Sequence, residues 1–150
     1  MKKFFIAGLI GIFFICAATA VYAAESKEDA KALVEKAAAF VKAQGKDKAL
    51  AEFNKPKGQF DKGELYIFVY DMKATVLAHP KNPKLIGKNL LDVPDSSGKL
   101  FRKEAVELAK TKGSGWIDYK YLNPSTKKVE SKTSYIEKVG DVILGCGTYK

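Results

Sequence analysis

The sequence has few of the side chains that most often carry out chemistry. It holds one histidine, His79, one arginine, Arg102, and two cysteines in 150 residues. A catalytic triad or dyad would have a single possible base, and no His-x-x-x-His pair, paired cysteines or acidic loop with the spacing of metal ligands is present. Gly113 and Gly115 follow an expected helix and precede an expected strand, which is the wrong order for a phosphate-binding loop. The sequence therefore predicts neither an enzyme nor a metal or cofactor site.

The first 23 residues have the pattern of a secretory signal peptide. Lys2 and Lys3 form a short positive start, residues 4–20 are almost wholly apolar, and residues 21–23 supply the small or apolar side chains of a cleavage site. We expect cleavage after Ala23, which leaves residues 24–150 as one exported, periplasmic domain. The alternative is a retained N-terminal membrane anchor, since about 17 to 20 apolar residues approach the length of a transmembrane helix.

The predicted cleavage also changes the cysteine count and the charge. It removes Cys16, so Cys146 has no partner for a disulfide within the chain and is expected to be a small buried hydrophobe. The formal charge of +9 falls to +7, from 24 Lys+Arg minus 17 Asp+Glu. Nearly all of this excess is lysine spread along the chain, whereas proteins that bind nucleic acid favour clustered arginine. We therefore expect a solvated basic surface and no nucleic-acid binding.

Hydrophobic periodicity predicts an α+β fold. Helical spacing covers residues 27–43, with Ser26 as N-cap, then residues 46–53, and about 99–112, with residues 95–97 as the cap. Alternating or β-branched runs predict five strands at residues 65–70, 74–79, 116–121, 129–139 and 142–149. Short connections between them favour an antiparallel five-stranded sheet with helices on one face. Residues 80–98 form a long irregular connection with enough apolar side chains to pack over a binding site.

One expected strand face is aromatic. Alternation in residues 65–70 places Tyr66, Phe68 and Tyr70 together. His79 follows at the end of the next expected strand, where it makes either a structural hydrogen bond or a ligand contact. Ordinary core packing is the alternative interpretation of the aromatic side chains.

The strands at residues 116–121 and 129–139 add a charge to this aromatic wall. A lysine within a sheet is rarely buried without a partner, so Lys132 predicts an anionic one, such as a ligand carboxylate, unless the side chain is simply exposed. We expect Trp116 and Lys132 to face one cavity. Strict alternation turns Tyr119 away from Trp116 and Tyr135 away from Lys132, so only a bulge would bring these two tyrosines into the same cavity.

Six motifs occur in an order that resembles a known family. They are YIFVYD, LAHP, LIGKNLLD, the helix after DSSGK, GWIDYKYLNPSTKKVESKTSY and the closing GCGTY. Together they cover about residues 28–149 and resemble the single Cache domain of the second type, the PAS-like extracellular sensor module of bacterial chemoreceptors and histidine kinases. The resemblance implies a long N-terminal helix, a five-stranded antiparallel sheet, and a pocket for a small organic acid such as pyruvate, acetate, lactate or propionate. Its matching positions are Tyr66, Phe68, Tyr70, His79, Trp116, Tyr119, Lys132 and Tyr135.

The resemblance also suggests how the protein works. A receptor of this family continues into a transmembrane helix and a signalling module, whereas this sequence stops at Lys150. We therefore expect a periplasmic binding protein that acts alone or with a membrane-bound chemoreceptor or histidine kinase. The alternative is a ligand-free structural or regulatory protein that forms a homodimer, or docks on a membrane sensor, through its N-terminal helix.

Overall fold

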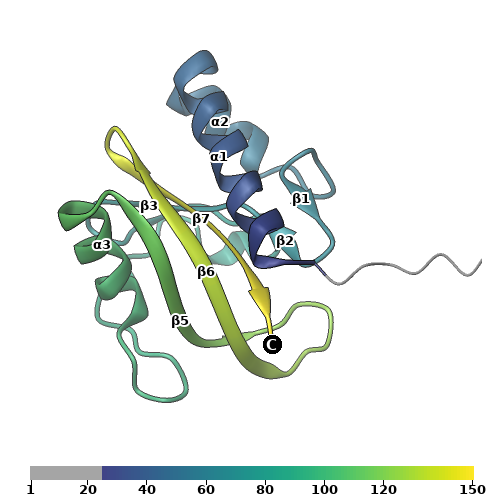
Figure 1. Cartoon of the computed structure of the whole chain (residues 1–150), viewed down its shortest axis with the longest axis vertical. Helices are drawn as coiled ribbons and strands as arrows, with labels where there is room; N and C mark the ends of the chain where they lie inside the picture. The colour runs from purple at the N-terminus through teal and green to yellow at the C-terminus, as the bar shows by residue number, and fades with distance from the viewer. Residues whose placement is uncertain (1–24) are drawn as a thin grey trace, which may run out of the picture.

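The structure is a computed structural model that describes residues 25–150 (Figure 1). The expected signal peptide and its cleavage after Ala23 lie outside these residues. Within them, no helix combines the length and the apolar character that crossing a membrane would require.

The described chain forms a mixed fold of helices and antiparallel strands, as the sequence predicts. Its elements, in order, are α1 (Lys27–Gln44), α2 (Lys46–Phe53), β1 (Asp61–Lys62), β2 (Leu65–Tyr66), β3 (Phe68–Asp71), β4 (Val76–Ala78), the 3-10 turn η1 (Pro83–Leu85), α3 (Phe101–Thr111), β5 (Ser114–Leu122), β6 (Val129–Val139) and β7 (Val142–Tyr149). Five strands form the main sheet in the order β4-β3-β7-β6-β5, with every neighbouring pair antiparallel. The fold class and the five-stranded sheet are confirmed.

Helix α1 begins and ends where its sequence signals predict. The Ser26 hydroxyl accepts a hydrogen bond from the Asp29 N–H (3.1 Å), and the Asp29 carboxylate accepts one from the Ser26 N–H (3.0 Å), which completes a capping box. At the other end, Gly45 adopts φ 84°, a left-handed conformation that favours glycine.

The predicted cap of the third helix is wrong. Helix α3 begins at Phe101, and its N-cap, Leu100, has no side-chain capping bond. One oxygen of Asp95 instead accepts hydrogen bonds from the N–H groups of Ser97 and Lys99, and the other accepts one from the N–H of Lys120 in β5. Asp95 therefore closes a turn of the long connection and ties it to the edge of the sheet.

The strand predicted at residues 65–70 is divided in two. The Ile67 N–H donates to the carbonyl of Phe60, outside the main sheet, so β2 pairs with β1 while β3 pairs with β4 and β7. The next strand is also shorter than predicted, since β4 ends at Ala78 and leaves His79 at the start of the long connection.

The helices lie on both faces of the sheet, and not on one face as expected. In Figure 1, α1 lies next to β7 and α3 lies beside β5; α1 contacts both β6 and β7. Helices α1 and α2 bury Ile67, Val69 and Leu144 in one hydrophobic cluster. Helix α3 and the long connection cover the other face, where Phe68, Ile117 and Ile136 belong to a second cluster. We call these the α1 face and the α3 face.

Candidate functional site

The register of β5 and β6 decides which predicted site residues meet. Trp116 pairs with Tyr135, and Tyr119 pairs with Lys132. Directly paired residues in an antiparallel sheet point to the same side, and successive residues alternate. The expectation that Trp116 and Lys132 share a cavity is therefore wrong. Tyr119 joins Lys132 on the α3 face without any bulge, and Trp116 and Tyr135 lie on the α1 face.

The α3 face holds Lys132 and five of the other seven predicted residues. The ammonium nitrogen of Lys132 lies 4.3 Å from the ring centroid of Tyr66 and 5.8 Å from that of Phe68. The rings of Phe68 and Tyr70 are 5.2 Å apart, and the Tyr119 hydroxyl is 2.9 Å from the hydroxyl of Ser134. Trp116 and Tyr135 instead contact each other, with centroids 5.3 Å apart, and lie near the lysines of α1.

Lys132 is a buried cation without a carboxylate partner. Its side chain is 1% exposed, and it forms no ion pair within residues 25–150. Its ammonium group donates to the hydroxyls of Tyr66 (2.9 Å) and Tyr149 (3.3 Å), which leaves a third N–H available when the group is protonated. Burial lowers the pKa of Lys132 to about 7. An anion brought to this nitrogen would favour its charged form.

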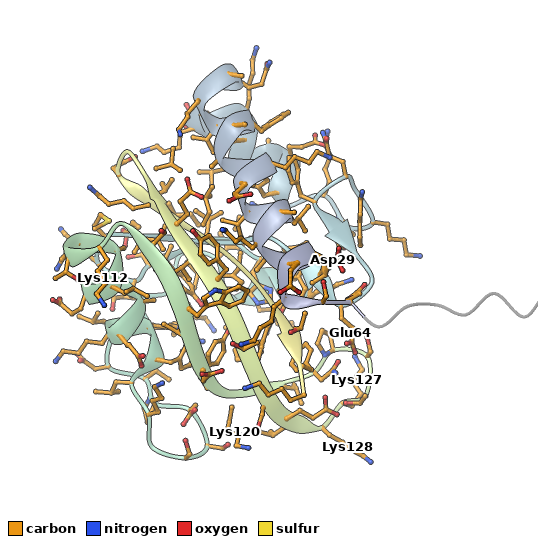
Figure 2. The ribbon with its side chains drawn as sticks, in the orientation of Figure 1. Asp29, Glu64, Lys112, Lys120, Lys127 and Lys128 are labelled. Carbon is orange, nitrogen blue, oxygen red and sulfur yellow. The ribbon has the colours of Figure 1, made fainter. Side chains whose placement is uncertain are left out.

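A nearby acid is engaged elsewhere. Glu64 is among the groups whose charge acts on Lys132, but its carboxylate accepts a hydrogen bond from the Asn123 side chain (3.0 Å). Asn123 also donates to Glu130 (2.8 Å) and so anchors the turn between β5 and β6. Figure 2 shows Glu64 at the margin of the fold, on the same side of the molecule as Lys127 and Lys128 of that turn. The buried ammonium thus remains uncompensated by a directly bonded carboxylate.

His79 is held as a neutral ring. Its Nδ1 accepts a hydrogen bond from the N–H of Asn82 (3.0 Å), so the ring proton of the neutral form resides on Nε2, which lies 3.2 Å from the Tyr121 hydroxyl. Burial, followed by the charge of Lys132, lowers the pKa of His79 to about 3. With Nε2–H donating, the hydroxyl proton of Tyr121 is free to be donated to another acceptor.

The two glycines of the GCGTY motif, Gly145 and Gly147, lie in β7 directly beneath side chains of this cluster. A Cβ atom on Gly145 would lie 2.2 Å from the ring of Phe68, and one on Gly147 would lie 2.1 Å from the Ser134 hydroxyl. Any side chain at either position would collide with a buried neighbour. The two glycines therefore let the site residues lie directly on the sheet.

Sequence reasoning missed three members of the cluster: Tyr121, Tyr149 and Arg102. Tyr121 lies two residues from Tyr119 and shares its face, and Tyr149 lies in GCGTY, so alternation could have identified both. Arg102 is 5% exposed, and it is spaced three, four and seven residues from the buried Ala105, Val106 and Ala109. That helical spacing was the available signal that the single arginine points inward.

Two hollows reach the cluster from outside. One, of about 130 Å³, is lined by Tyr66, His79 and Tyr121 together with Lys81, Asn82, Leu122, Pro124 and Lys127. The other, of about 260 Å³, reaches Tyr119 and Lys132 beside the loop of Ser97 and Lys99. No group of three or more potential metal ligands occurs in the described part of the chain. A small hollow that ends at buried donors is suited to a small polar ligand.

This arrangement is that of a PAS-like domain, with a five-stranded antiparallel sheet, a long N-terminal helix on one face, and a shorter helix with a long connection on the other. A family model described as a Cache domain (dCache_2) matches residues 30–150. The chain therefore belongs to the Cache domain family, as the six motifs indicate.

Individual proteins support the same assignment. The chain is 33% identical over 86 residues to the methyl-accepting chemotaxis protein McpP of Pseudomonas putida. These 86 residues are 56% of this chain and 16% of that protein. The chain thus spans about a sixth of the length of this curated relative.

Solved structures extend the comparison to the fold. A methyl-accepting chemotaxis protein from Vibrio parahaemolyticus superposes with a TM-score of 0.72 over 82% of this chain and 87% of that one, at 23% identity. A Cache chemosensory domain, whose structure is described as the structural basis for carboxylic acid recognition, gives a TM-score of 0.64 at 27% identity, over 81% of this chain and 86% of that one.

Proposed function

We propose that this protein is an exported sensory domain that binds a small monocarboxylic acid on the α3 face of its sheet. The observation that carries the proposal is Lys132, whose ammonium group is buried, bonded to two tyrosine hydroxyls and free of any carboxylate partner in the described chain. Burying a charge without a partner is costly. A ligand carboxylate would supply the missing partner through a charge-assisted hydrogen bond.

The other residues of the cluster take complementary roles in this proposal. The hydroxyls of Tyr66, Tyr121 and Tyr149 orient the carboxylate oxygens, and neutral His79 fixes the direction of the Tyr121 hydroxyl. Phe68 and Tyr119 exclude water, which strengthens each polar contact. Trp116 and Tyr135 have no part in binding, because they lie on the opposite face.

The cellular setting belongs to the proposal as well. The leader-like pattern of residues 1–23 supports export to the periplasm, with residues 24–150 as the single mature domain. The similarity to a chemotaxis protein supports a partner that is a membrane-bound chemoreceptor or sensor kinase. A binding role fits a site whose one histidine is buried and already engaged, its Nδ1 by the N–H of Asn82 and its Nε2 by the hydroxyl of Tyr121.

The alternative, a ligand-free protein that dimerises or docks through its N-terminal helix, has weaker support. The apolar stripe of α1 that would form such a seam is already covered, since Ala30, Leu33, Val34 and Ala37 are buried against the same chain. The alternative would therefore need a different surface of α1.

Isothermal titration of the purified protein with acids of two to four carbons tests the proposal. We expect at least one acid to bind, and a concentration of about 100 times its Kd to raise the free energy of unfolding by roughly 2.7 kcal/mol. Lys132→Met should abolish binding. Lys138→Met is the matched control, because Lys138 lies on the same strand and face but is exposed. Absence of binding by every acid at millimolar concentration, or full binding by Lys132→Met, would contradict the proposal.

A further inference from the structure

Three of the five exposed large hydrophobic side chains of the described chain lie on one face of the β5–β6 hairpin. They are Trp116, Leu122 and Val129, which are 38%, 54% and 55% exposed. Leu122 pairs directly with Val129, and it is six residues from Trp116, so register and alternation place all three on the α1 face. Exposed hydrophobic residues that are scattered singly need no explanation, but three that share one surface suggest a place of contact.

This surface lies beside α1 and is not covered by it. Helix α1 contacts β6 and β7, and Figure 1 shows the turn between β5 and β6 extending beyond the start of the helix. Asp118 and Lys120, which lie between Trp116 and Leu122 on the same side of β5, are exposed as well. We call the α1-facing side of residues 116–122, with Val129 and Ser131 of β6, the hairpin strip.

The middle of the hairpin strip is hollowed and basic. A hollow of about 260 Å³ is lined in part by Asp118, Lys120, Ser131 and Lys150. Asp118 and Lys150 form an ion pair (3.2 Å). The Lys120 ammonium donates to the Ser131 hydroxyl (2.6 Å) and has no carboxylate partner within residues 25–150. The strip is therefore apolar at both ends and has an unpaired positive charge between them.

The α1 side of the hairpin strip is also bordered by lysines. The ammonium nitrogen of Lys27 lies 5.2 Å from the ring centroid of Trp116, and that of Lys31 lies 5.6 Å from the ring centroid of Tyr135. Lys31 pairs with Glu35 (3.6 Å), whereas Lys27 forms no ion pair in the described part of the chain. Complementarity of charge thus favours an acidic partner.

The main chain of β5 is not open to another strand, although β5 is the outer strand of the sheet. The N–H of Lys120 donates to the carboxylate of Asp95, and the carbonyl of Asp118 accepts a hydrogen bond from the ammonium of Lys99. An occupied edge does not accept an additional strand. A partner is therefore expected to contact the side chains of the strip and not to extend the sheet.

The hairpin strip has the length of a short helix. The six residues from Trp116 to Leu122 span about 20 Å at about 3.4 Å per residue, which a helix of about 13 residues covers. We propose that the hairpin strip docks an amphipathic helix of a partner protein, whose docking face has apolar side chains at both ends and a carboxylate between them. The carboxylate meets Lys120, and the apolar ends meet Trp116 and Leu122. This docking does not depend on the proposed acid site, because Trp116 and Leu122 face away from it.

A second copy of the chain offers no such helix. None of the five exposed large hydrophobic residues lies in α1, α2 or α3. The exposed side of α1 carries more lysines than acids, and its lysines would meet those of the strip; the exposed charged residues are Lys27, Glu28, Asp29, Lys31, Glu35, Lys36 and Lys42. The expected partner is therefore a different protein.

Fluorescence of the purified protein tests the inference, because Trp116 is the only tryptophan of the chain. The probe is a synthetic helical peptide of about 14 residues without tryptophan, with leucines at both ends of one face and glutamates between them. A second peptide has lysines in place of the glutamates. We expect the glutamate peptide to change the emission of Trp116 saturably and to bind about tenfold more tightly than the lysine peptide. Salt should reduce this difference.

Four results would overturn the inference. Two of them are equal affinities of the two peptides and an unchanged emission of Trp116 with both. A change of emission that depends on protein concentration without any peptide would assign the strip to a second copy of the chain. A response to vesicles of anionic phospholipid alone would assign it to a membrane surface.

Two pairs of variants locate the contact. Leu122→Ser should weaken the glutamate peptide about tenfold or more, because a buried leucine is lost from the interface. Ile86→Ser is its control, since Ile86 is also exposed but lies in the long connection. Lys120→Gln should bring the affinities of the two peptides closer together, and Lys110→Gln, at an exposed lysine of α3, should preserve their ratio. Equal losses in Leu122→Ser and Ile86→Ser, or an unchanged ratio in Lys120→Gln, would contradict the inference.

Discussion

The two faces of the sheet are built from different chemistry. The α1 face buries alanine, valine, leucine and two phenylalanines, Phe53 and Phe60, whose ring centroids are 4.8 Å apart, and the partly buried Phe40 lies 6.3 Å from Phe53. The α3 face also has an apolar cluster, but it holds all three buried basic side chains of the described chain, Lys132, Arg102 and His79. Apolar burial stabilises the folded state, while buried charges oppose folding unless they are paired.

The contrast indicates a division of labour between stability and recognition. Contacts beneath α1 are satisfied within the chain, since apolar side chains need only one another. Those of the α3 face are incomplete, because Lys132 has neutral hydroxyl acceptors but no carboxylate partner within residues 25–150, and the buried Nε of Arg102 has no acceptor there. Changes on the α1 face should therefore alter stability, and changes on the α3 face should alter ligand affinity and the response to pH.

The largest expected effect comes from a truncation on the α1 face. Phe53 is fully buried, so Phe53→Ala leaves a cavity between α2 and its aromatic neighbours and should lower the free energy of unfolding by about 3–5 kcal/mol. Urea denaturation measures this loss. Phe53→Leu, which keeps most of the volume, should cost less. Acid affinity of the folded fraction should stay unchanged in both variants, and a tenfold loss of affinity would show that the two faces are not independent.

A smaller effect, of opposite direction, is expected for Lys132→Met. The folded protein has a Lys132 pKa of about 7, against 10.5 for an ordinary lysine. Between these values the unfolded chain holds a proton that the folded protein has released, so stability rises with pH by up to about 1.4 kcal/mol per unit. Below pH 7 both states carry the charge and its burial opposes folding in full. Lys132→Met should therefore be more stable than the unmodified protein at pH 6, by about 1 kcal/mol or more.

Urea denaturation at pH 6, 7, 8 and 9 checks this prediction. Above pH 7 the unmodified protein and Lys138→Met should show the rise with pH, and Lys132→Met should lose most of it. Below pH 7 the lowered pKa of buried His79 adds a smaller rise to all three proteins. Tyrosines do not interfere in this window, because burial raises the pKa values of Tyr66, Tyr121 and Tyr149 above their ordinary value near 10. Parallel pH profiles for all three proteins would contradict the assignment of Lys132 as a buried, uncompensated cation.

Local signals in the sequence were sufficient for most of the fold. The N-cap at Ser26 and the strands at residues 129–139 and 142–149 depend on neighbouring residues, and the structure confirms them. The predicted ends of a strand were wrong where a contact with a distant part of the chain determines them. Ile67 leaves the main sheet because its N–H reaches the carbonyl of Phe60, which no pattern within residues 65–70 reveals.

The site was harder to predict, because it depends on how strands are aligned. Alternation fixes the faces within one strand, but register fixes the relation between two strands. Here the register follows from the turn after β5, where the Asn123 N–H donates to the carbonyl of Lys128 and Lys127 adopts φ 61°. The sequence indicates a turn between these strands but not its hydrogen bonds. It therefore does not determine whether Lys132 pairs with Tyr119 or with a neighbouring residue that faces the other side of the sheet.

Trp116 provides the most sensitive test of that register, although the expected change is the smallest. Trp116 is 38% exposed on the α1 face, where the ammonium nitrogen of Lys27 lies 5.2 Å from its ring centroid. Trp116→Ala should cost about 0.5–1 kcal/mol of stability through the lost cation–π contact, and more from lost packing with Tyr135. Acid affinity should stay within about twofold, a change of roughly 0.4 kcal/mol. Titration calorimetry measures the affinity, and urea denaturation the stability.

Tyr121→Phe is the matched comparison, since it removes one hydroxyl from the same strand on the α3 face. Tyr121→Phe should weaken acid binding by about tenfold or more, because a hydrogen bond to a charged carboxylate contributes about 1.5–3 kcal/mol. Comparison of the two variants thus shows which face of β5 contacts the bound acid. If Trp116→Ala weakened binding as much as Tyr121→Phe, the ligand would have to contact both sides of one strand, which a single site on one face of a sheet does not allow. Selective loss in Tyr121→Phe would place recognition on the α3 face alone.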